Sequence, residues 1–265
     1  ECLPALLLGM FGGYPTGAAA ARTLMDSGKI SRSEARRLIS FCLSPGIGFC
    51  VNAVGASMLG SRHSGALILA SVCISLLPLG MLSKLISGSE PPLTRPPLPQ
   101  IALPGAIVRS VTACAEAMLS ICAFVSLFSG LAAVASGFIT NKRILTALML
   151  LAEVTSGCLA SAGKLPLPIL CAECAFGGLC VHMQVFALSG EADPPKKFFF
   201  MFRALHAALS AAVCAVLLQF FPVAQQTFAV YGEPHAWSHS APASVSLLFL
   251  CALLILDLDT GKKKC

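Results

Sequence analysis

Two glutamates lie inside apolar stretches of the sequence, each close to small residues that would interrupt a helix. Glu153 directly precedes Val-Thr-Ser-Gly, and Glu173 precedes Gly177-Gly178. An ionisable side chain in a membrane segment is costly and usually faces a cavity or a partner. Both carboxylates are therefore candidate ligands of a coupling cation or acceptors for the hydroxyl groups of a solute. The alternative is a position at the membrane interface, where Lys164 could pair with either of them.

Three further polar side chains lie within apolar stretches, namely Asn52, His182 and Gln184. Amide and imidazole groups supply the donors and acceptors that read sugars and bases, so these residues are candidates for binding a solute. Hydrogen bonding between helices explains them equally well. No metal site is expected, because only Cys174 and Cys180 accompany His182 at ligand-like spacing.

Small polar residues and glycines mark the interruptions themselves. In lipid, every backbone group that a break releases must find a partner inside the protein. Pro45 removes a backbone donor and glycine weakens a helix, so a break is expected near residues 44–48. The side chains expected to satisfy these breaks, with a ligand contact as an addition, are Thr16, Ser44, Thr155 and Ser156, and Gly46 in the first break is a further candidate for binding the solute.

No catalytic constellation accompanies these residues. The sequence shows no Ser-His-Asp order, no phosphate-binding loop and no paired-carboxylate signature, so we predict neither an enzyme nor a cofactor. The 13 cysteines lie mostly within apolar runs, which favours packing roles over disulfide bonds. Cys171 and Cys174 have CxxC spacing, which leaves a metal or redox role open as the less favoured reading.

Composition places these residues in a membrane. The 265 residues are 56% hydrophobic and only 11% charged, whereas soluble domains are about a quarter charged. The net charge of +6 is spread between apolar segments, which is typical of orientation signals and argues against nucleic-acid binding. We predict an all-α, polytopic helical protein of the cell membrane, with membrane lipids as partners.

Apolar segments of suitable length are expected at residues 65–86, 105–138, 144–162, 198–221 and 245–256. Residues 2–21 and 41–60 are apolar but interrupted, and a capping box at Ser31 and Glu34 predicts a helix running into Phe41. If residues 165–189 form a re-entrant hairpin, most Lys and Arg fall on one side of the membrane, which favours that hairpin. The chain starts inside an apolar segment without Met, so we expect it to lack an N-terminal part.

The two halves of the chain carry similar signals in the same order. Each has a small-residue break, a connector, a second break containing glycine, and then Cys-Val followed by an amide side chain. This order predicts an inverted internal repeat with two broken or re-entrant segments, a plan common in transporters. The predicted organisation is a first membrane half at residues 1–90, a proline-rich connector at 91–104, a second membrane half at 105–257 and a basic tail at 258–265.

The same motifs carry a resemblance to a family. Gly-Gly-Tyr-Pro-Thr-Gly-Ala at 12–18, the basic connector at 28–42, Ser-Pro-Gly at 44–46, Glu-Val-Thr-Ser-Gly-Cys at 153–158 and Phe-Gly-Gly-Leu-Cys-Val-His-Met-Gln at 176–184 resemble the YlbJ-type sporulation integral membrane proteins, which carry the nucleoside-recognition or Gate domain. Thr16 departs from the Val that is usual in the first motif, and Ser-Pro-Gly replaces the usual Ser-Gly-Pro. The resemblance implies an endospore-forming bacterium and an architecture similar to concentrative nucleoside transporters.

These observations together predict a transporter-like membrane protein that binds a small polar solute, of which a nucleoside is one candidate. Glu153 and Glu173 would hold a coupling cation or ligand hydroxyls, and Asn52, His182 and Gln184 would read the solute. The alternative is a non-transporting membrane scaffold required for assembly of the spore envelope or cortex.

Overall fold

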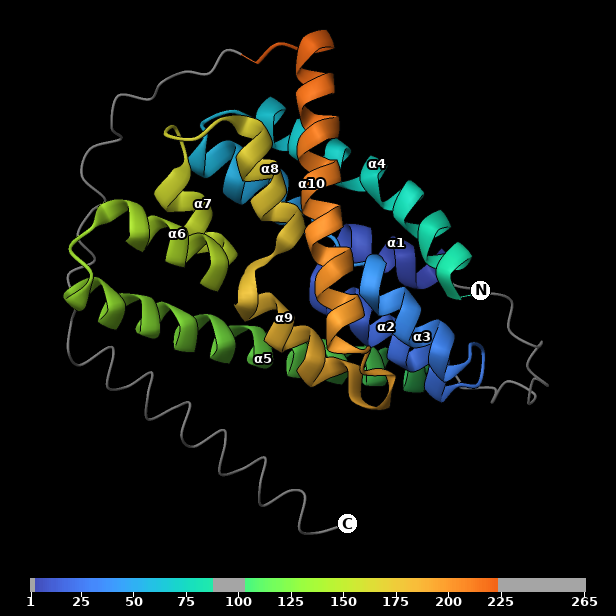
Figure 1. Cartoon of the computed structure of the whole chain (residues 1–265). Helices are drawn as coiled ribbons and strands as arrows, with labels where there is room; N and C mark the ends of the chain where they lie inside the picture. Colours follow the sequence, from blue (N-terminus) through green and yellow to red (C-terminus); the bar gives the residue numbers. More distant parts are fainter. Residues whose placement is uncertain (1–2, 88–102, 224–265) are drawn as a thin grey trace. The chain divides into compact units, whose positions relative to one another are not determined.

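The computed structural model describes residues 3–87 and 103–223, and every regular element within these ranges is a helix (Figure 1). The predicted last span at 245–256, the basic tail and nearly all of the connector at 91–104 lie outside the described residues. The helices are α1 (Leu3–Gly12), α2 (Tyr14–Asp26), α3 (Arg32–Phe41), the π-helix η1 (Gly48–Met58), α4 (Arg62–Ser87), α5 (Leu103–Phe138), α6 (Lys142–Ala152), α7 (Val154–Ser161), α8 (Leu167–Phe176), α9 (Gly178–Ser189), the short 3₁₀ helix η2 (Gly190–Ala192) and α10 (Lys196–Phe220).

Within the described ranges, four helical segments are long and apolar enough to cross a membrane. They are Arg62–Ile86, Ser110–Phe138, Leu167–Ala192 and Lys196–Phe220. The helical, membrane-type character predicted from composition is thus confirmed as far as length and hydropathy can show it. The capping box is also confirmed, because the Ser31 hydroxyl accepts the Glu34 backbone N–H and the Glu34 carboxylate accepts the Ser31 N–H.

The first interrupted segment, α3 and η1, runs antiparallel to the whole of α4. The Phe41 ring at the end of α3 packs on Gly80, late in α4, whereas Gly55 in η1 packs on Gly65, early in α4. Residues 42–47 separate the two helical parts without reversing the chain. The break predicted at residues 44–48 is therefore present, and it interrupts a segment that continues along its partner helix.

The second interrupted segment, α8 and α9, runs antiparallel to α10 in the same manner. Cys171 in α8 lies 3.5 Å from the Ser210 carbonyl oxygen, whereas the His182 ring in α9 lies 5.2 Å from the Phe199 ring. The segment therefore continues along α10 without reversing, and the re-entrant hairpin predicted at 165–189 is wrong. The physical reason is local: Gly177 and Gly178 adopt φ 88° and 71°, so two successive glycines with positive φ end α8 and begin α9 without an intervening loop.

Helical hairpins are present elsewhere, at α1–α2 and at α6–α7. A Cβ on Gly17 would lie 3.0 Å from the Gly9 Cα, and a Cβ on Gly157 would lie 2.8 Å from the Leu150 Cα, so the chain folds back at Gly13 and at Glu153. The single span predicted at 144–162 is accordingly two helices of 11 and 8 residues. At 1.5 Å per residue they extend about 17 and 12 Å, too short to cross a hydrocarbon core of about 30 Å.

The η1 segment is a π-helix of 11 residues. Its bonds reach back five residues, as in the Leu59 N–H to Val54 oxygen bond of 2.9 Å, and the Ser57 hydroxyl donates to the Asn52 carbonyl at 3.1 Å. Such helices usually last a single turn and frequently mark functional sites. Glycines at 55 and 65 let the backbone of this π-helix touch α4.

The contact between η1 and α4 generates a prediction about Gly65. A Cβ there would lie 2.4 Å from the Cys50 carbonyl oxygen and 2.9 Å from the Cα atoms of Val51 and Gly55, all of them backbone atoms. Gly65→Ala should therefore destabilise the fold by about 1–3 kcal/mol, measured as thermal unfolding of the purified chain in detergent. Gly130→Ala in α5 is the matched control, because its Cβ meets nothing within 4 Å. Equal stability of the two variants would contradict the packing described.

Candidate functional site

The candidate site lies where the helix interruptions of the two halves pack together. Gly46, in the first break, would place a Cβ 3.1–3.2 Å from backbone atoms of Phe11, Gly12 and Gly13, which form the tip of the α1–α2 hairpin. Gly178, in the second break, would place a Cβ 3.3 Å from backbone atoms of Ala152 and Glu153, at the tip of the α6–α7 hairpin. Each hairpin tip thus touches the break of the interrupted segment that follows it in sequence.

Tyr14 joins these two pairs of interruptions. It follows the α1–α2 tip directly, and its ring carbons would lie 3.3 Å from a Cβ on Gly177. Its hydroxyl donates a hydrogen bond to the Cys174 carbonyl, in the last turn of α8. One buried side chain from the first half therefore satisfies the backbone at the break of the second half.

Glu153 forms the N-cap of α7. Its side chain is buried, with Oε1 accepting the Thr155 N–H at 2.8 Å and Oε2 accepting the Ser156 N–H at 2.6 Å. Both oxygens thus face the positive end of the helix dipole and use the otherwise unpaired donors of its first turn. The residue predicted as a ligand for a cation or solute has a sufficient structural role as a cap.

Glu173 lacks such partners. It is 9% exposed, and its Oε1 is fully buried and makes no hydrogen bond to any residue in the described ranges. That oxygen lies 3.1 Å from the position of a Cβ on Gly157, so it faces the first turn of α7, which Glu153 caps. A carboxyl group buried beside another carboxylate requires a cation, a proton or a hydroxyl donor. Glu173 is therefore the better placed of the two predicted acids for binding a ligand.

His182 and Gln184 are both buried on α9, next to this break. His182 Nε2 lies 2.8 Å from the Phe176 carbonyl oxygen, which requires the proton on Nε2 and leaves Nδ1 without a partner within the described part of the chain. The rings of Phe176, Phe199 and Phe200 surround His182. The Gln184 amide donates to Cys180 Sγ at 3.3 Å, one turn back on the same helix. Gln184 thus contacts its own helix and His182 packs against α10, and the expectation that both bind a solute stays a prediction.

The small polar residues mostly satisfy the backbone at the breaks. The Thr16 hydroxyl lies 2.7 Å from the Gly13 carbonyl and 3.0 Å from the Leu8 carbonyl, and the buried Ser44 hydroxyl lies 3.2 Å from the Pro45 carbonyl. Thr155 and Ser156 contribute their backbone N–H groups to Glu153, as described above. Asn52 is exposed on η1, and no contact in the described ranges joins it to either glutamate.

Sequence reasoning missed a buried arginine. Arg203 is completely buried in α10, with Nη1 donating to the Leu43 carbonyl at 2.8 Å, at the start of the first break. Nη2 donates to Nδ1 of the buried His206, whose Nε2 donates in turn to the Val72 carbonyl at 3.2 Å. In the sequence, Arg203 follows Lys196 and Lys197 closely at the start of an apolar span. The signal that was missed is the separation of Arg203 from Lys196. Seven residues of α-helix place Arg203 about 10 Å further along α10 than Lys196.

The two glutamates should respond differently to neutralisation. Glu153→Gln replaces a charged cap by a neutral side chain with one acceptor and should destabilise the fold by about 1 kcal/mol. Glu173→Gln removes a buried carboxyl group whose Oε1 has no donor, so stability should be unchanged or higher. Thermal unfolding of both variants in the same detergent measures the difference. A larger loss in Glu173→Gln than in Glu153→Gln would contradict the assigned roles.

Arg203 should not tolerate lysine. Lysine retains the charge but lacks the planar fork that reaches both the Leu43 carbonyl and His206. Arg203→Lys should therefore cost about 1–3 kcal/mol of stability, as the loss of a hydrogen bond to a charged group. Arg37→Lys, at a half-buried position of α3, is the matched control and should have no measurable effect in the same unfolding assay.

Comparison with known proteins does not extend these assignments. No protein-family model, no curated protein and no solved structure matches this chain. The likeness to YlbJ-type proteins rests on the motifs quoted above, and it therefore enters the functional argument as a prediction.

Proposed function

We propose that this chain is a transporter-like membrane protein that binds a small polar solute where the hairpin tips meet the interrupted segments. The observation that carries the proposal is the buried Oε1 of Glu173, which has no partner in the described residues and faces the capped first turn of α7. Membrane transporters commonly build their sites from discontinuous helices near the middle of the bilayer. A buried carboxylate in that setting suits a solute hydroxyl or a coupling cation.

The order of the elements supports an inverted repeat within this proposal. A short hairpin, an interrupted segment and a long helix follow one another as α1–α2, α3–η1 and α4, and again as α6–α7, α8–α9 and α10. The connector at residues 27–31 lies beside η2, at the start of α10. The turn at residues 162–166 leads into α8, and α8 contacts the later half of α10 through Cys171 and Ser210. The two equivalent connectors thus lie at opposite ends, as inversion requires.

The chemistry of the breaks indicates the class of solute. Glu173 offers a buried carboxyl oxygen without a partner in the described residues, which suits a ligand that carries hydroxyl or amide donors. The resemblance to nucleoside-recognition proteins leads to the same class, and a nucleoside is the first solute to test. We place the protein in the cell membrane of an endospore-forming bacterium on the same resemblance.

Uptake by proteoliposomes tests the proposal. The full chain would be reconstituted and supplied with a panel of labelled nucleosides and related polar solutes, with and without gradients of H⁺ and Na⁺. Glu173→Gln should lower uptake of the transported solute by tenfold or more, because a hydrogen bond to a charged group contributes about 1.5–3 kcal/mol. Glu191→Gln, at an exposed position of η2, is the matched control and should leave uptake unchanged.

Two results would contradict the proposal. One is the absence of uptake of every solute by a chain that elutes as a folded species and retains its thermal stability. The other is unchanged uptake by Glu173→Gln. The first result would favour the alternative of a non-transporting scaffold for spore-envelope assembly.

A further inference from the structure

The described helices gather basic side chains at one end of the bundle, which we call the basic end: Lys29, Arg32, Arg36, Arg37, Lys196 and Lys197. Two contacts bring the contributing segments together. Arg32 Nε donates to the Glu191 carbonyl at 2.8 Å, and Gly190 lies against the Arg22 guanidinium, which a Cβ there would approach to 3.1 Å. The connector between α2 and α3 is thereby fixed against the loop between α9 and α10.

This end coincides with the limit of two apolar spans. The segment Leu167–Ala192 ends here and Lys196–Phe220 begins here, so residues 193–195 form the turn between them. A turn between two membrane-crossing helices lies at the level of the lipid headgroups. The basic side chains of α3 and of the first turn of α10 therefore lie at headgroup depth.

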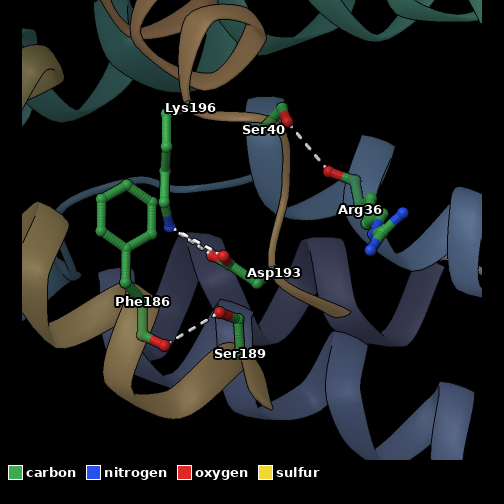
Figure 2. A network of polar contacts seen from close by, with 6 residues as sticks. All are labelled: Arg36, Ser40, Phe186, Ser189, Asp193 and Lys196. Carbon is green, nitrogen blue, oxygen red and sulfur yellow. Dashed lines mark hydrogen bonds and ion pairs between the residues drawn. The ribbon is translucent and has the colours of Figure 1, made fainter. Parts of the chain in front are cut away.

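Three of the four acidic side chains at this end have partners, and the exposed Glu191 is the fourth. Asp26 pairs with Arg22 at 3.5 Å, and Glu34 is used in the capping box of α3. Asp193 is held by Lys196, whose ammonium lies 2.6 Å from Oδ1 and 3.4 Å from the centre of the Phe186 ring (Figure 2). These carboxylates are paired within the protein, so the basic end carries more positive than negative side chains.

The remaining cations have no acidic partner. Lys29, Arg36, Arg37 and Lys197 make no ion pair with any residue in the described ranges, and the Arg36 Nε is buried without a hydrogen-bond partner. Figure 2 shows the Arg36 guanidinium lying apart from the Asp193 carboxylate, which Lys196 occupies. A buried guanidinium nitrogen without an acceptor favours an anion from outside the chain.

We propose that the basic end binds the phosphate headgroups of anionic phospholipids, and that it faces the cytoplasm. Headgroup depth and excess positive charge together favour this ligand over an acidic protein or a nucleic acid. Arginine forks match phosphate geometry, and the cytoplasmic leaflet is the negatively charged one. The proposal does not depend on transport and concerns a different part of the helices from the breaks around Glu173.

Native mass spectrometry of the full chain in detergent tests this proposal. Phosphatidylglycerol and phosphatidylcholine would be titrated separately, and the dissociation constant of the first bound lipid would be compared. We expect phosphatidylglycerol to bind on the order of tenfold more tightly, since each basic residue near an anionic headgroup contributes about a fivefold gain. The preference should weaken as ionic strength rises.

Variants separate the basic end from charge in general. Arg36→Gln with Arg37→Gln should abolish the preference for phosphatidylglycerol, whereas Lys142→Gln with Arg143→Gln, exposed at the start of α6, should retain it. If the first pair does not fold, as judged by its elution volume, Lys29→Gln with Lys197→Gln alters only exposed side chains and serves instead.

Several outcomes would overturn the proposal. They are equal binding of the two lipids by the unaltered chain, an equal loss of preference in the Lys142 and Arg143 control, and tight binding of a single-stranded oligonucleotide in place of phosphatidylglycerol.

Discussion

Each helix interruption in the described residues must satisfy its own backbone inside the bundle, because apolar surroundings offer no hydrogen-bond partners. The structure meets that requirement by packing interruptions against one another. Gly46 lies on the tip of the first hairpin, Gly178 lies on the tip of the second, and Tyr14 bonds across to the Cys174 carbonyl. The hairpins, the two crossing segments and the long helices beside them are all arranged around these contacts.

The requirement also explains which charges are buried. Glu153 caps the helix that begins at the second tip, and Arg203 donates to a carbonyl at the first break. At the breaks, both side chains therefore provide the hydrogen-bond partners that the backbone of an intact helix would have provided. Glu173 is the exception, since its Oε1 neither caps a helix nor meets a donor among the described residues. A buried polar group without a hydrogen-bond partner is a candidate for binding a ligand, whereas one whose partners lie within the protein has a structural role.

The positions of the interruptions could be predicted from the sequence, but their geometry could not. Proline and glycine signal where a helix stops, and each break expected at residues 12–17, 44–48, 153–157 and 177–178 has a counterpart in the structure. Whether the chain then reverses or continues depends on which surface receives the next helix. The role of Glu153 also depended on the structure, because an acid beside a break can either bind a ligand or cap the next helix. The distribution of Lys and Arg favoured a hairpin at residues 165–189, whereas the segment continues beside α10, so the charges along the chain did not determine its path.

The π-helical form of η1 has a consequence for movement. A π-helix takes more residues to complete each turn than an α-helix does, so the same residues cover less length along the axis. The segment Gly48–Met58 is consequently shorter along its axis than an α-helix of the same 11 residues between the first break and the start of α4. A change of its hydrogen bonds from five residues to four would lengthen and rotate the segment while its two ends remained helical. The first interrupted segment could therefore lengthen through a change from π-helix to α-helix. Its counterpart α9 is already an α-helix and has no such change open to it.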